Sequence, residues 1–201
     1  MSFGEFGDGL PDMLAQRLFD QRVVLLRGTL DARAATRASA ELMTLDAQGD
    51  EAVTLRIDCG SGSLAEALTL MDVIELLGVP VRALCLGQVG AAAIGVLSVT
   101  AERSALPSTR FSLKEPATSW QSSARDVAQL AQLRADERER FCARLAAAIA
   151  QSAQRVGDDL AKGVYLGAQE ALDYGIIDEI RGHEAQIHQL GGAQMGFRPR
   201  P

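Results

Sequence analysis

The feature that most constrains the fold is a pattern of an apolar run followed by a helix, which occurs twice in the middle of the chain. Its first copy has an apolar run at Val53 to Ile57, a glycine-rich turn at 60 to 62, and a helix from Ser63 to about Leu77. Its second copy has an apolar run at Val81 to Leu86, followed by a small-residue helix that reaches about Val99. Short apolar runs of this kind are typical of buried strands. Because they alternate with helices, we expect a parallel sheet with crossover helices.

The segments on either side extend the same pattern. Val23 to Leu26 is apolar and begins with two valines, which predicts another buried strand. Asp31 is a suitable N-cap residue, because its carboxylate can accept a free N–H at a helix start, and it predicts a helix over 32 to 46. Further short elements are predicted as a helix at 12 to 20 and strands at 103 to 106 and 110 to 114.

Apolar residues also recur at helical spacing over a much longer stretch, from Arg125 to about Arg155. A continuous helix of some thirty residues would be roughly 45 Å long, which exceeds the width of a small domain. A helix that extends beyond its own core usually packs on a partner or crosses a solvent gap. The pattern therefore predicts a projecting helix.

Composition narrows the functional class. A chain of 201 residues makes one domain, and its net charge of −6 argues against a nucleic-acid surface. It contains no apolar run long enough to span a bilayer. The three cysteines, Cys59, Cys85 and Cys142, are scattered, which favours a reducing setting over disulfides or a metal site. We therefore expect a cytoplasmic protein with no metal, no cofactor, no nucleic-acid partner and no membrane partner.

Four motifs lie in a distinctive order along the chain. The first runs from Leu14 to Asp31 and ends in R-V-V-L-L-R-G-T-L-D, and the second is L-R-I-D-C-G-S-G-S, starting at Leu55. The third, between Cys85 and Pro116, contains G-Q-V-G-A-A-A and A-L-P-S-T-R-F-S-L-K-E-P. The fourth is Y-L-G-A-Q-E-A-L-D-Y-G-I-I-D-E-I, starting at Tyr165. Together they resemble the ClpP family of ATP-dependent serine peptidases.

The resemblance implies a crotonase-like fold, which is an α/β right-handed superhelix of β-β-α units with a protruding handle helix. It covers a single domain over residues 14–180, with the handle at about 117–156. We expect flexible segments on both sides, at 1–13 and at the glycine- and proline-containing 181–201. The resemblance also implies ClpP-like paralogous subunits in seven-membered rings as partners, together with a hexameric AAA+ unfoldase.

The resemblance also locates the family's three catalytic positions, and none of them holds the family's residue. Ala91 occupies the slot of the serine nucleophile, Lys114 the slot of the histidine base, and Gly163 the slot of the acid. A methyl group cannot attack a carbonyl, and a protonated lysine cannot accept a hydroxyl proton. Asp158 and Asp159 lie just upstream, within a small shift of the acid slot. The substitutions predict a non-catalytic member, comparable to the ClpR-type subunits of mixed Clp complexes.

The family's oxyanion-hole turn, written S-P-G-G, corresponds here to Cys59-Gly60-Ser61-Gly62. Backbone N–H donors can survive this exchange, because the glycines still permit unusual φ angles. We therefore expect an oxyanion-hole-like arrangement from Gly60, Ser61, Gly62 and Ala92. The thiol of Cys59 is a candidate nucleophile, but no base lies near it in sequence, and a buried small thiol is the simpler interpretation.

The family's handle contacts a second ring, and its glycine-rich strand is replaced here by A-T-S-W-Q-S-S, starting at Ala117. The tryptophan in this segment either alters the ring contacts or serves as a half-buried anchor. The resemblance implies an oligomerisation surface formed by Trp120, Val127, Leu130, Leu133 and Phe141.

Two other functions remain open. One is an active peptidase with a Ser-Lys arrangement, in which burial lowers the pKa of Lys114 and a nearby serine attacks; Ser61, Ser98 and Ser112 are nearest in sequence. The other is a crotonase-like binder of acyl-CoA.

A histidine base within the core is not available to any of these functions. The only two histidines, His183 and His188, lie beyond the last motif.

Overall fold

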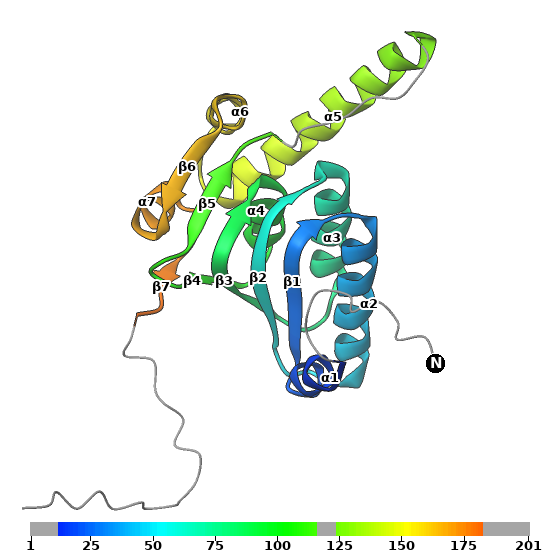
Figure 1. Ribbon diagram of the computed structural model, residues 1–201, viewed down its shortest axis with the longest axis vertical. Helices are drawn as coiled ribbons and strands as arrows, with labels where there is room; N and C mark the ends of the chain where they lie inside the picture. Colours follow the sequence, from blue (N-terminus) through cyan, green and yellow to red (C-terminus); the bar gives the residue numbers. More distant parts are fainter. Residues whose placement is uncertain (1–11, 116–123, 183–201) are drawn as a thin grey trace, which may run out of the picture.

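The computed structural model describes residues 12–115 and 124–182, and within them the predicted parallel sheet is present (Figure 1). Its main path has the strand order β1-β2-β3-β4-β7, with every neighbouring pair parallel. β5 pairs with the end of β3 and, antiparallel, with β6. The strands are β1 (Val23–Leu30), β2 (Val53–Gly62), β3 (Val81–Gly90), β4 (Glu102–Ala105), β5 (Arg110–Leu113), β6 (Val164–Gly167) and β7 (Glu179–Ile180).

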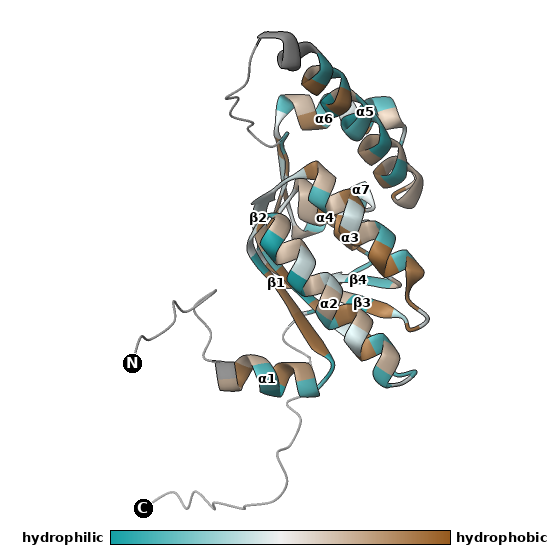
Figure 2. Ribbon diagram, turned by 90° about the vertical axis from the view of Figure 1, so that its right-hand side faces the viewer, coloured by the Kyte–Doolittle hydropathy of each residue, from teal (hydrophilic) through white to brown (hydrophobic). Residues whose placement is uncertain are grey.

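The helices α2, α3 and α4 connect successive parallel strands as crossovers, and Figure 2 shows all three on the same side of the sheet. The apolar core lies between these helices and β1 to β3, where alternate strand residues are buried. The helices are α1 (Asp12–Asp20), α2 (Ala32–Gln48), α3 (Leu64–Leu76), α4 (Ala91–Ser98), α5 (Ala124–Ala148), α6 (Ala153–Lys162) and α7 (Ala168–Tyr174).

The Asp31 cap is confirmed. Its carboxylate accepts a hydrogen bond of 2.8 Å from the Ala34 backbone N–H, at the first turn of α2. The helix predicted to start at Ser63 is also present, although the Ser63 side chain makes no capping bond. Short-range sequence signals therefore located these two helix starts.

The glycine-rich turn predicted at 60 to 62 is wrong, because this stretch is the end of β2. Cys59 pairs with Gly28, Ser61 pairs with Thr29, and Gly60 between them is skipped in the register. The extra residue is accommodated as a β-bulge, a feature that re-aims the strand without ending it. Pairing with β1 on both sides of Gly60 keeps the strand extended.

The long helix ends earlier than predicted. α5 ends at Ala148, and Ala150 then adopts a left-handed conformation with φ of 54°. A second helix, α6, starts at Ala153, where the Ser152 hydroxyl accepts a hydrogen bond from the Arg155 N–H. The apolar periodicity continues across this break, so it did not reveal the change of direction.

The carboxyl-terminal half of α5 is held firmly by the rest of the domain. Phe141 is fully buried against Gly95 of α4. Arg144 forms ion pairs with Asp72 at 2.5 Å and Glu75 at 2.8 Å on α3. The opposite half of α5 projects away from the sheet (Figure 1). The predicted projecting helix is therefore present, with one end anchored.

The described structure extends slightly beyond the expected domain limits of 14 and 180. α1 already begins at Asp12, and the Arg181 N–H donates to the Ala105 carbonyl at 2.9 Å. The remaining parts of the two segments predicted to be flexible lie outside the described residues.

Candidate functional site

The carboxyl ends of β2, β3 and β5 meet beside a cleft of about 900 Å³. Such an edge of a parallel sheet is where α/β proteins commonly place ligands. The cleft is lined by Gln88 and Tyr165, which were not predicted to be site residues, by the candidate serine Ser112, and by six of the predicted site residues. The six are Gly60, Ser61, Gly62, Ala91, Ala92 and Lys114.

Ala91 and Ala92 enter the cleft because β3 runs directly into α4 at this point. Gly90 is the N-cap of α4, and no side chain caps the helix there. An ideal Cβ on Gly90 would lie 2.3 Å from the Gly60 carbonyl oxygen, so β2 and β3 approach more closely than any side chain permits. Glycine at position 90 therefore sets where the Ala91 methyl group lies relative to the end of β2.

Lys114 and Gly163 are neighbours, although they are far apart in sequence. An ideal Cβ on Gly163 would lie 3.6 Å from Cγ of Lys114, and Gly163 has a left-handed φ of 73° as the C-cap of α6. Lys114 is exposed just past the end of β5, and its side chain lines the cleft. The structure thus places position 163 beside position 114, and position 114 in one cleft with position 91.

The acidic side chains near Lys114 have other partners. Glu115 pairs with Arg138 at 2.7 Å, and the Asp159 carboxylate accepts a hydrogen bond of 2.7 Å from the Tyr174 hydroxyl. Among residues 13–115 and 129–182, whose side chains are described, no carboxylate forms an ion pair with Lys114. Neither Glu115 nor Asp159 therefore pairs with Lys114.

The three candidate serines lie in different environments. Ser98 is buried and donates its hydroxyl hydrogen to the Gly95 carbonyl at 2.7 Å, so it does not face the cleft. Ser61 lines the cleft, and its hydroxyl lies 2.9 Å from that of Thr29. Ser112 also lines the cleft, on the strand face opposite buried Phe111 and Leu113.

Cys59 is the buried thiol that the simpler interpretation predicted. It is fully buried, and its Sγ donates to the Ser61 carbonyl at 3.2 Å. Burial raises the pKa of the Cys59 thiol to about 11, with smaller opposing effects from backbone hydrogen bonds. Burial raises the pKa of Cys85 to about 12 and that of Cys142 in the same direction. None of the three thiols is poised as a nucleophile.

We therefore expect all three cysteines to resist alkylation in the folded protein. With a pKa of about 11, only about one Cys59 in ten thousand is a thiolate at pH 7. Intact-mass measurement after iodoacetamide treatment should show no adduct under native conditions and three adducts in denaturant. Rapid modification of the native protein at Cys59 would contradict the burial argument.

The residues predicted to form the handle surface lie in different environments. Trp120 lies outside the described residues, as does the side chain of Val127 on α5. Leu130 is half-buried and Leu133 is 47% exposed. Phe141, however, is 0% exposed because it fills the space beside Gly95. Assigning Phe141 to an oligomerisation surface was wrong; it anchors α5 to its own core.

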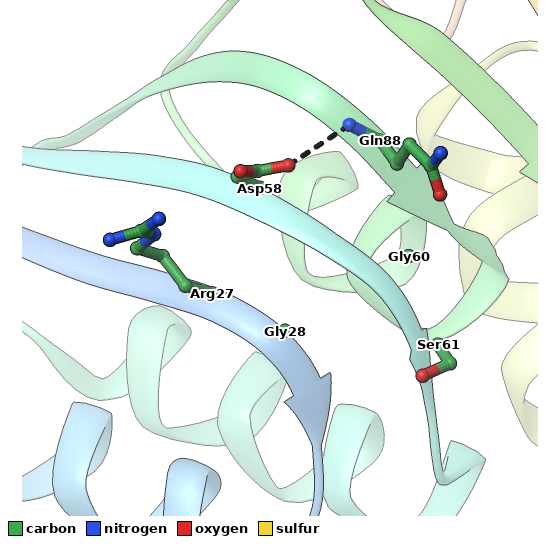
Figure 3. A pocket seen from close by; sticks show the side chains of 6 residues that line it. All are labelled: Arg27, Gly28, Asp58, Gly60, Ser61 and Gln88. Atoms are coloured by element: carbon green, nitrogen blue, oxygen red, sulfur yellow. Dashed lines mark hydrogen bonds between the residues drawn. The ribbon is translucent and has the colours of Figure 1, made fainter. Parts of the chain in front are cut away.

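A second hollow, of about 610 Å³, adjoins the cleft at the ends of β1, β2 and β3 (Figure 3). It shares Gly60, Ser61 and Gln88 with the cleft and adds Arg27 and Asp58. The Gln88 backbone N–H donates to the Asp58 carboxylate at 3.0 Å, as drawn in Figure 3. This bond ties β3 to β2 just before β3 reaches the cleft.

Neither a metal cluster nor a membrane helix is found in the described part of the chain. Residues 12–115 and 124–182 contain no group of three or more histidine, cysteine, aspartate or glutamate side chains able to hold a metal ion. Their helices include none that is both long and apolar enough to cross a bilayer. The two histidines lie outside the described residues.

Comparisons with known proteins agree with the fold. The family model for Clp protease matches residues 10–184. ATP-dependent Clp protease proteolytic subunit 2 of Thermobifida fusca is 32% identical, over 84% of this chain and 85% of its own length. Proteolytic subunit 1 of Corynebacterium diphtheriae is 30% identical, over 82% and 80%. The structure of a ClpP1 point mutant from Listeria monocytogenes superposes with a TM-score of 0.75 at 28% identity, covering 85% of this chain and 97% of that one.

These matches define the class of protein as a proteolytic-subunit homologue with the ClpP-type, crotonase-like α/β fold. The chain belongs to the Clp protease family. The predicted resemblance and fold class are confirmed. The acyl-CoA alternative gains no support, since the relatives named above are all described as Clp protease subunits.

Proposed function

We propose that this chain is a non-catalytic subunit of an ATP-dependent Clp protease. The observation that carries the proposal is that Ala91 and Lys114 line one cleft. The family motifs assign these two residues to the serine and histidine slots, where they supply only a methyl group and an amine. Gly163, beside Lys114, has no side chain to serve as the acid. With all three relay groups replaced, no path remains for moving a proton from a nucleophile to a leaving amine.

The proposal places the chain in a mixed ring with triad-complete paralogous subunits, where it supplies surface rather than chemistry. The projecting half of α5, with half-buried Leu130 and exposed Leu133, supports contact with a second subunit. A hexameric AAA+ unfoldase would feed substrate to such an assembly. The proposed setting is the cytoplasm, in keeping with three buried cysteines that form no disulfide.

The second candidate is a peptidase that uses a Ser-Lys pair. It is favoured by one observation: Ser61 and Ser112 line the same cleft as Lys114, and Lys114 has no acidic partner among the described residues. However, neither serine lies at the strand-to-helix junction, which Ala91 occupies. A sharp strand-to-helix junction is one of the places where α/β folds present a nucleophile to a carbonyl, and neither Ser61 nor Ser112 occupies one.

The test is covalent labelling. We expect a fluorophosphonate probe to leave the purified protein unlabelled and a short fluorogenic peptide to remain uncut, while a triad-complete Clp subunit in a parallel sample reacts. Mixing the two proteins should produce a larger complex on size-exclusion chromatography. Labelling of Ser61 or Ser112 would establish the Ser-Lys alternative, and a persistent lone monomer in the mixture would contradict ring assembly.

A further inference from the structure

We infer that the cleft binds the free carboxylate of a short peptide, with Lys114 as the group that receives it. The inference rests on the proposed function, because a catalytically active cleft would cleave a bound peptide and would not retain it. The starting point is the balance of charge in the cleft. Its charged lining residues are three acids and three bases, namely Asp31, Glu115, Glu137, Lys114, Arg134 and Arg138.

Every other charged side chain that lines the cleft already has an ion-pair or hydrogen-bond partner. Arg138 pairs with Glu115 at 2.7 Å, and Arg134 pairs with Glu137 at 3.3 Å. Asp31 accepts the capping N–H of α2. Of the cleft's cations, Lys114 alone has no anionic partner among the side chains of residues 13–115 and 129–182. The segment that follows it, 116–123, contains no aspartate or glutamate in its sequence. Its charge is therefore available to an anion that enters from outside.

The surroundings of Lys114 indicate which kind of anion fits. Ala91 and Ala92, at the start of α4, present two methyl groups to the same cleft, next to the glycine-containing end of β2. Gly163 leaves room beside the lysine, where its ideal Cβ would only reach ordinary contact with Lys114. A small-residue wall next to one cation suits a compact carboxylate carried on an apolar chain better than a bulky polyanion.

The strand order sets the length of ligand that the cleft can hold. The cleft reaches from the end of β1, at Thr29 and Leu30, to Lys114 just past β5, across the ends of β2 and β3. Three strand spacings amount to roughly 14 Å, which an extended chain covers with about four residues. Peptides of this length, ending in a free carboxylate, are what an active neighbouring subunit would release by hydrolysis.

The probe for the test is N-trifluoroacetyl-tetraalanine, prepared with a free C-terminal carboxylate and as the C-terminal amide. Blocking the N-terminus leaves the carboxylate as the only charge that differs between the two forms. Binding to the full-length protein is followed by ¹⁹F line broadening at pH 7 and low salt. A single exposed charge pair predicts a preference for the acid of roughly two- to fivefold, which shrinks as salt is added.

The chain offers a matched control, because it contains only two lysines. Lys114→Met should remove the preference for the acid. Lys162→Met, at an exposed position outside the cleft lining, should leave the preference intact. Equal binding of acid and amide, or a preference that survives Lys114→Met, would overturn the inference. Chromatography of the same samples detects cleavage of the probe, which would instead overturn the proposed lack of catalysis.

Discussion

The triple substitution Ala91→Ser, Lys114→His and Gly163→Asp is expected to create fluorophosphonate labelling that none of the three single substitutions produces. Positions 91 and 114 share the cleft, and position 163 lies beside position 114, so the three new side chains would be close enough to form a relay. Removing any one member of such a triad costs several orders of magnitude in rate, so single and double variants should stay at background.

Most of the loss of folding stability expected from the triple substitution arises at position 163. Gly163 has a φ of 73°, a conformation that aspartate tolerates better than most side chains, at a cost of about 1–2 kcal/mol. The variant should therefore fold with a somewhat lower melting temperature. Labelling is measured by intact mass, and we expect a signal roughly a hundredfold above the wild type.

A matched control variant changes only the position of the new serine hydroxyl. Ala92→Ser replaces Ala91→Ser in the same triple variant, which shifts the serine by about 100° around α4. This control should remain unlabelled. A folded triple variant that stays inert would contradict the assignment of the three slots, whereas labelling of the control alone would shift the nucleophile slot by one residue.

Gly90→Ala is expected to cause the largest loss of stability of any single methyl addition at the site. The new Cβ would lie 2.3 Å from the Gly60 carbonyl oxygen and 2.7 Å from its carbon, and both are backbone atoms of a paired strand. Neither can turn aside as a flexible side chain would, so β2 and β3 must separate. We expect a loss of about 3 kcal/mol, the upper end of what overpacking usually costs.

Urea unfolding measures this effect, with Gly78→Ala as the control. An ideal Cβ on Gly78 meets only Asp46 Oδ1 at 3.6 Å, which is ordinary contact, and the Gly78 N–H that donates to Asp46 is retained. The control should change the free energy of unfolding by less than about 0.5 kcal/mol. Similar unfolding midpoints for the two variants would show that the junction of β3 with α4 is less tightly constrained than the distances indicate.

Much of the fold followed from local patterns in the sequence. The apolar runs became β1, β2 and β3, and Asp31 caps α2 as its side-chain chemistry requires. These features depend on interactions between residues near one another in the chain, which is why they can be read without knowing the tertiary structure. The three slots at 91, 114 and 163 came from family motifs, and the structure brings their positions together.

Other features were decided by contacts between distant segments. Gly60 to Gly62 read as a turn by composition, but pairing with β1 on both sides of a bulge keeps them in a strand. Phe141 fits the apolar stripe of a projecting helix, yet it is buried because Gly95, 46 residues earlier, leaves space for its ring.

The sequence by itself determined most of the strands and helices, and its motifs predict that Ala91, Lys114 and Gly163 stand at the family's relay positions. The tertiary structure decided which side chains surround positions 91, 114 and 163 and which partners those side chains have. Lys114 lies beside Gly163, whereas Glu115 forms an ion pair with Arg138 and the Asp159 carboxylate accepts a hydrogen bond from the Tyr174 hydroxyl. The physical reason is that ionic partners are chosen by distance and direction in space, and separation along the chain specifies neither.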